Sequence, residues 1–228
     1  MNEYRKPTFS RYGVVAVTLH WTIALLIIGM LALGVLMTWL PPTDPLKFSL
    51  YQWHKSIGVL IFTLSVVRLG WRLINPPPPL PATMAAWEKR AASSAHAAFY
   101  VLMIGMPLLG WMMVSASPWN IPTNPFNLFN VPHLPLLAGH PEKQAWESVF
   151  KNLHAAGAVM LALLLVVHVG AALRHHLILR DDVLARMAPW IAPRARPEGG
   201  PTATAGPSSS DSQTRAGAKP GTRKGHSQ

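Results

Sequence analysis

Histidines are the residues of this 228-residue sequence best suited to metal or redox chemistry. There are ten of them and no cysteine, which excludes disulfides, iron–sulfur clusters and every thiolate-bound metal group. Five lie within or at the edge of long apolar runs: His20, His54, His96, His154 and His168. An ionisable side chain is costly inside a membrane, so each of these five is a candidate functional residue.

Four apolar runs carry these histidines, at residues 14–40, 53–74, 91–114 and 148–173. Each exceeds the roughly 20 residues that a helix needs to cross about 30 Å of hydrocarbon. Only 13% of the residues are charged, against about 25% in a soluble domain, and the mean hydropathy is +0.23. In lipid, a helix satisfies its own backbone donors and acceptors. The sequence therefore predicts an all-α fold, an integral membrane four-helix bundle.

Lysine and arginine gather at one end of these helices. That end holds Arg5, Lys6, Arg11, Arg68, Arg72, Lys89, Arg90, Arg174, Arg180 and Arg186, whereas the other end holds only Lys47, Lys55, Lys143 and Lys151. Since basic residues favour the cytoplasmic side, both termini are predicted to be cytoplasmic. This distribution accounts for the net charge of +11 without nucleic acid as a partner.

The chain divides into three predicted parts. Residues 1–13 form a cytoplasmic N-terminus, and residues 14–192 form the transmembrane domain. Residues 193–228 are rich in Pro, Gly, Ser, Thr and basic residues with almost nothing apolar. Such a composition buries too little surface to fold, so a disordered cytoplasmic tail is expected.

Helix direction sorts the histidines by depth. His54 and His154 fall near the outer face, and His20 and His168 near the inner face. His154 and His168 are fourteen residues apart, which is about 40° short of four turns and about 21 Å along the axis. Two haems stacked across the bilayer, each held by two imidazoles, require such an arrangement. Two axial imidazoles leave the iron no open position, which favours electron transfer.

Other residues leave alternatives open. Arg68 follows His54 by fourteen residues, so it lies at the inner level and either binds a haem propionate or snorkels to the interface. His96 is an alternative inner ligand or part of a quinone pocket. His175 and His176 end the last helix, where such residues are usually solvated. His175 is also a candidate for a quinone site with His96 and Arg68.

Several motifs occur in a specific order along residues 10–190. They are Arg11-Tyr12, Leu19-His20-Trp21, Trp53-His54-Lys55-Ser56-Ile57-Gly58, Val66-Val67-Arg68-Leu69 with Trp71-Arg72, Ala95-His96, Pro107-Leu108-Leu109-Gly110-Trp111, and Asn152-Leu153-His154 leading to His168. In this order they resemble the bacterial cytochrome b561 family. The resemblance implies a four-helix protein of the bacterial inner membrane with two b haems. It implies the ligands His20, His54, His154 and His168, and electron exchange with the quinone pool.

Three functions are consistent with these features. The resemblance implies a redox protein that passes electrons between a donor and quinone, with superoxide-to-ubiquinone transfer as one form. It also allows a cytochrome subunit that anchors a hydrogenase or another dehydrogenase. The third is a haem-free transporter or proton relay that uses the same histidines. No Asp or Glu lies well inside the four apolar runs, which favours haem over a relay.

Overall fold

The computed structural model describes residues 11–80 and 84–192, and the predicted tail lies outside them. Four long helices dominate this part: α1 (Val14–Trp39), α2 (Pro45–Ile74), α3 (Ala86–Ala116) and α5 (Lys143–Arg174). Four short elements complete it: η1 (Pro125–Asn127), α4 (Pro135–Ala138), η2 (His175–Leu179) and α6 (Val183–Met187). The described residues contain no strand, and all four long helices are long and apolar enough to cross a membrane. The predicted all-α membrane fold is thus confirmed.

Proline and polar residues set the helix ends. α2 begins eight residues before the apolar run because Asp44 accepts a hydrogen bond from the N–H of Leu46 (2.9 Å), and Pro45 suits the first helical position. The same helix ends where the N–H of Asn75 bonds to Trp71 O, just before four consecutive prolines that cannot continue it. α3 runs through Pro107 without ending.

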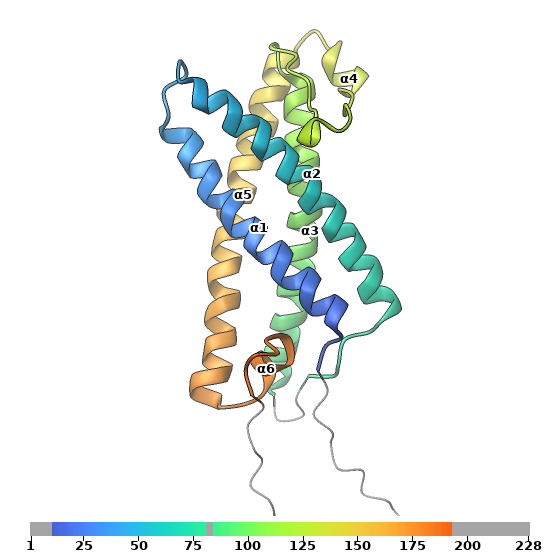
Figure 1. The fold of residues 1–228 in the computed structure, drawn as a ribbon, viewed down its shortest axis with the longest axis vertical. Coiled ribbons are helices and arrows are strands. Elements are labelled where there is room, and N and C mark those ends of the chain that lie inside the picture. Colours follow the sequence, from blue (N-terminus) through green and yellow to red (C-terminus); the bar gives the residue numbers. More distant parts are fainter. Residues whose placement is uncertain (1–10, 81–83, 193–228) are drawn as a thin grey trace, which may run out of the picture. The chain divides into compact units, whose positions relative to one another are not determined.

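The long helices pack in two layers. In Figure 1, α1 and α2 lie in front of α3 and α5. The backbones approach closely between α1 and α2, between α2 and α3, and between α3 and α5. Within the described part, α5 makes no comparably close backbone packing with α1 or α2. Side chains therefore have to bridge the space between α5 and the front layer.

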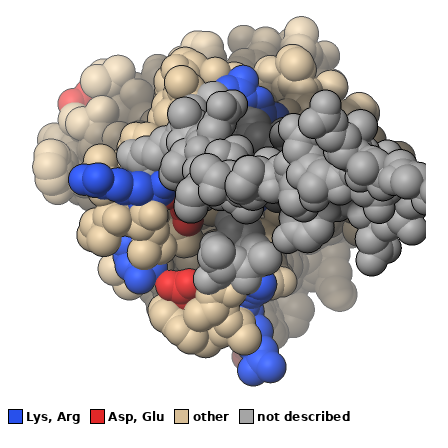
Figure 2. Space-filling view, turned by 90° about the horizontal axis from the view of Figure 1, so that it is seen from below, with Lys and Arg blue, Asp and Glu red and all other residues tan. Residues whose placement is uncertain are grey.

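We call the end where the described chain begins and finishes the terminal end, and the opposite end the loop end. At the terminal end, the segment after α5 turns back under the bundle. Trp21 Nε1 donates to Met187 O (2.9 Å), and Arg186 Nη1 donates to Pro79 O (2.6 Å). Figure 2 views this end and shows more Lys and Arg than Asp and Glu on the visible described surface.

Candidate metal centres

Two pairs of imidazoles bridge α5 and the front layer. At the terminal end, the ring centroids of His20 on α1 and His168 on α5 are 6.2 Å apart. At the loop end, those of His54 on α2 and His154 on α5 are 6.1 Å apart. The interplanar angles are also similar, at 67° and 62°. The helices thus bring together the residues that depth alone had paired.

This spacing suits one metal ion between two imidazoles. Metal–imidazole bonds in proteins are about 2.0–2.1 Å long, so two rings on opposite sides of one ion have centroids about 6 Å apart. The Nδ1 atom of His54 is buried and makes no hydrogen bond within the described residues. A buried polar atom without a partner calls for an explanation, and a group that is not part of the polypeptide supplies one.

A third imidazole belongs to the terminal-end cluster. The His96 ring on α3 lies 6.0 Å from that of His168, at 67°. Phe99, also on α3, packs edge-on against His168 at 5.2 Å. His168 therefore has two neighbours, His20 and His96, at the same spacing, and distance alone does not choose between them.

Arg68 adds a cation to this cluster. Its Nη1 lies 3.0 Å from Nδ1 of His20. A guanidinium only donates hydrogen bonds, so Nδ1 of His20 must accept. A histidine that binds metal through Nε2 usually carries its proton on Nδ1 and needs an acceptor there. If Nε2 of His20 bound a metal, Nδ1 would carry the ring proton and could no longer accept a hydrogen bond from Arg68. The guanidinium would then be free to bind an anionic group near the metal.

An apolar layer separates the two clusters. Its buried members are Ile23, Ile27, Ile61, Met103 and Leu161. Leu161 stands midway between the two histidines of α5, and Ile61 stands midway between His54 and Arg68. The layer excludes water and keeps the dielectric constant low between the clusters.

The glycines near the histidines of α5 differ in how tightly they are packed. A Cβ at Gly110 would lie 3.6 Å from Cε1 of His154, which is ordinary contact. A Cβ at Gly157 would collide with Sδ of Met106, so the Met106 side chain would have to move. A Cβ at Gly170 would meet nothing within 4 Å. The small residues that flank the histidines in the sequence are thus not all needed for packing.

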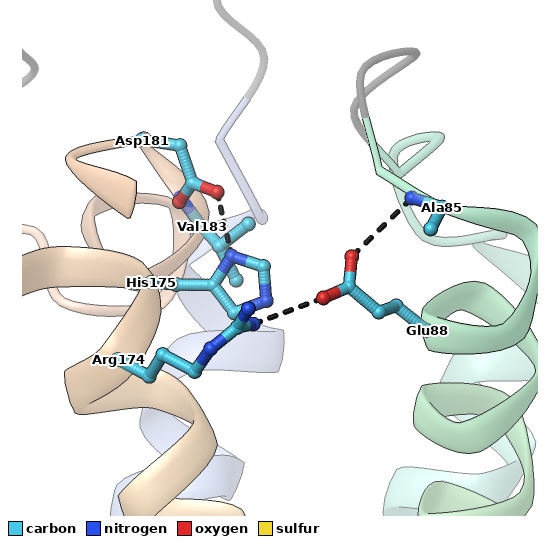
Figure 3. Close-up of polar contacts among 6 residues, drawn as sticks. All are labelled: Ala85, Glu88, Arg174, His175, Asp181 and Val183. Atoms are coloured by element: carbon cyan, nitrogen blue, oxygen red, sulfur yellow. Dashed lines mark hydrogen bonds and ion pairs between the residues drawn. The ribbon is translucent and has the colours of Figure 1, made fainter. Parts of the chain in front are cut away.

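His175 is not solvated, so that expectation was wrong. The residue is only 9% exposed, and its Nδ1 lies 2.6 Å from Oδ2 of Asp181. α5 continues into the η2 turn, and Arg180 takes a left-handed conformation (φ 53°) that returns Asp181 to the histidine. Figure 3 shows this pair beside the ion pair of Arg174 and Glu88 (2.9 Å).

Sequence reasoning missed the acidic partners of this terminal-end network. Asp181 also accepts the N–H of Val183, and Glu88 also accepts the N–H of Ala85. Outside residues 117–147, the sequence from Trp71 to Ala188 contains only three acidic residues: Glu88, Asp181 and Asp182. Their rarity was the available signal. The candidate quinone residues are only partly assembled, because His96 contacts His168 whereas His175 pairs with Asp181.

A family model described as prokaryotic cytochrome b561 matches residues 11–190. The chain belongs to this family. It is 36% identical to cytochrome b561 homolog 2 of Escherichia coli K12 over 79% of this chain and 92% of that protein. It is 31% identical to homolog 1 of the same organism, over 79% and 98%. A protein of Yersinia pestis named probable superoxide oxidase CybB is 26% identical over 78% and 96%.

The cytochrome b561 family binds haem b, and the donor set of this member fits that group. Haem iron can bind two histidines, and each cluster offers at least two imidazoles. No group of three or more His, Cys, Asp or Glu suited to a non-haem metal occurs in the described part of the chain.

Proposed function

We propose that this chain is a di-haem b cytochrome that passes electrons between a donor and the membrane quinone pool. The observation that carries the proposal is the repeated spacing of two imidazole pairs, 6.1 and 6.2 Å, within one membrane bundle. His54 and His154 would hold one haem, and His20 and His168 the other. Bound haem supplies a one-electron iron couple.

The protein's part is to hold, separate and tune these groups. The histidines would hold the two haems, and the apolar layer around Ile61 and Leu161 keeps water out between the two sites. Arg68 supplies a positive charge at the terminal-end site, where it would pair with a propionate. These roles concern the domain of residues 14–192 and require nothing of the tail.

The haem count tests this proposal. Protein purified from membranes in detergent should hold two low-spin b haems per chain by a pyridine haemochromogen assay. One haem would show that one pair is misassigned. No haem in folded, haem-supplemented protein would refute the cytochrome function and favour a transporter or proton relay.

We propose superoxide as donor and ubiquinone as acceptor. Two superoxide ions each give up one electron and become oxygen, and the quinone takes two electrons and two protons. The name of the Yersinia pestis relative supports this choice. Lys47 and Lys55 also hold positive charge at the loop end, where each donates to a backbone carbonyl (2.8 and 2.7 Å). Absence of superoxide-dependent quinone reduction by haem-loaded protein would refute this assignment.

A cytochrome subunit that anchors a hydrogenase or another dehydrogenase is the second candidate. Every described helix is either a membrane span or a short connecting or capping element, so this chain has no described domain that would oxidise such a substrate. Copurification of a dehydrogenase from native membranes would favour this candidate over superoxide.

The quinone site is proposed at the terminal end, around His96, Arg68 and His175. His96 and Arg68 belong to the terminal-end cluster, and the pair of His175 and Asp181 offers a proton-exchanging group nearby. Haem reduction by quinol should slow in His96→Gln and His175→Gln but not in His176→Gln. Equal rates in all three variants would refute this site.

We propose that the protein lies in the bacterial inner membrane with both termini in the cytoplasm. The excess of Lys and Arg at the terminal end supports this orientation. Because the chain has no cysteine, single cysteines at Lys89 and Gln144 can report the two sides. A membrane-impermeant maleimide added to intact cells should label Gln144→Cys only.

A further inference from the structure

The loop between α3 and α5 is unusual for a connection between two membrane helices. It contains η1 and α4, and no Asp, Glu, Lys or Arg occurs from residue 91 to residue 141. Several of its large apolar side chains are exposed: Trp119 (79%), Leu128 (77%), Phe129 (55%) and Leu136 (81%). A water-exposed loop would normally carry charge and hide such residues.

The loop does not project from the bundle but folds back along it. Pro122 O accepts from Nζ of Lys55 (2.7 Å), and the N–H of Phe126 donates to Oγ of buried Ser56 (3.1 Å). Trp53 and Phe126 pack edge to face. These α2 residues lie eight to eleven residues inside the helix, about 12–17 Å from its start. The loop thus reaches the level of His54.

Two further contacts hold the other half of the loop on α3. Oγ of Ser115 accepts from the N–H of Leu134 (3.0 Å), and Nε1 of Trp111 donates to Pro132 O (2.9 Å). An antiparallel bridge joins Thr123 and Val131. In Figure 1, the loop and α4 lie alongside the upper ends of α3 and α5. The loop is therefore an ordered structure with a fixed depth, not a free strand of chain.

We propose that residues 117–139 form a membrane-interfacial element, with Trp119, Leu128, Phe129 and Leu136 inserted among the lipids of the outer leaflet. The helices that the loop connects also expose apolar side chains and are apolar enough to cross a membrane. Aromatic residues favour the interface, and an uncharged segment loses no ionic hydration there. The four exposed asparagines, Asn120, Asn124, Asn127 and Asn130, supply the polar groups that remain in the headgroup region.

Spin labelling of the full-length protein tests this proposal directly, because no native cysteine interferes. Leu128→Cys and Leu136→Cys would each carry a nitroxide in vesicles of phosphatidylethanolamine and phosphatidylglycerol. Collisions with oxygen, which concentrates in lipid, are compared with collisions with a neutral nickel chelate, which stays in water. Gln144→Cys serves as the water control, and Val166→Cys, on an exposed part of α5 (71%), as the lipid control.

Both loop labels should lose nickel collisions and gain oxygen collisions relative to Gln144, and so approach Val166. High nickel accessibility at both would overturn the proposal, because the loop would then lie in water. Protection from both reagents would also overturn it, because a second copy or a partner protein would then cover the loop. Each label is read separately and only in protein with an unchanged elution position, so a single misfolded variant does not decide the result.

Discussion

The two histidine clusters share a spacing but differ in their surroundings. At the loop end, the rings of His54 and His154 lie 6.1 Å apart, and Nδ1 of His54 is buried without a hydrogen-bond partner within the described residues. No third histidine contacts their rings within the described residues. The neighbouring loop carries no charged residue of its own. This cluster can hold a metal group between two imidazoles, and it offers little else.

The terminal-end cluster has more functional groups. His168 contacts both His20 and His96, and Arg68 lies 3.0 Å from His20. The pair of His175 and Asp181 follows one η2 turn beyond α5. Within the described residues, this end has a possible proton-exchanging pair in addition to a cation beside the imidazoles. Under the proposed function, the loop end would pass electrons, whereas the terminal end would also serve the protons and charges of quinone chemistry.

The largest expected effect comes from removing a loop-end imidazole. His154→Ala should lose its haem completely and halve the ratio of haem to protein, because no other imidazole replaces the ligand. The pyridine haemochromogen assay measures this ratio, and His176→Ala should retain both haems. Two low-spin haems in His154→Ala would disprove the loop-end assignment.

Removing His20 should have a smaller effect, since His96 stands at the same distance from His168. We expect His20→Ala to keep part of the terminal-end haem with a changed absorption band. His96→Ala should keep both haems, and the double variant should lose one. Reduced-minus-oxidised spectra distinguish these cases. Complete haem loss in His20→Ala alone would show that His96 does not substitute, and the contrast between the two ends would disappear.

Arg68→Ala should shift one midpoint potential and leave the other unchanged. A nearby positive charge stabilises the reduced, less positive iron, so its loss lowers the potential. The Coulomb interaction between the two charges at an effective dielectric constant near 20 corresponds to tens of millivolts. Redox titration of both haems measures the shift, with Arg68→Lys expected to restore most of it and Arg90→Ala to change neither. Equal shifts of both midpoint potentials would contradict the prediction that Arg68 acts on the terminal-end haem alone.

Helical regularity explains what the sequence could predict. The relative depth of His154 and His168, and the helix face on which they lie, follow from the rise and rotation per residue of an α-helix. The level of Arg68 follows in the same way. The early start of α2 was also readable, because Asp44 and Pro45 are a normal helix beginning. The four long helices were accordingly found, although the first turns of α2, α3 and α5 were not.

The remaining contacts depend on segments without a helical period. His175 meets Asp181 only because Arg180 adopts a left-handed conformation after η2. Sequence spacing gives no such return. Likewise, the loop after α3 is held by the hydroxyls of Ser56 and Ser115, one of them 70 residues distant from its partner. No local pattern marks a serine as the acceptor for a distant N–H, so the fold of this loop could not be predicted.

The smallest expected effect concerns one of those hydroxyls. Ser56 Oγ donates to Gln52 O (2.8 Å) and accepts from the N–H of Phe126. Ser56→Ala would leave that N–H without a partner, which should cost about 1–2 kcal/mol. Ser65→Ala is the matched control, because Ser65 is equally buried in α2 but its hydroxyl makes no hydrogen bond within the described residues. Denaturation in detergent should therefore show a lower midpoint for Ser56→Ala than for Ser65→Ala. Equal midpoints would mean that the loop is held on α2 by Lys55 and Trp53 rather than by Ser56.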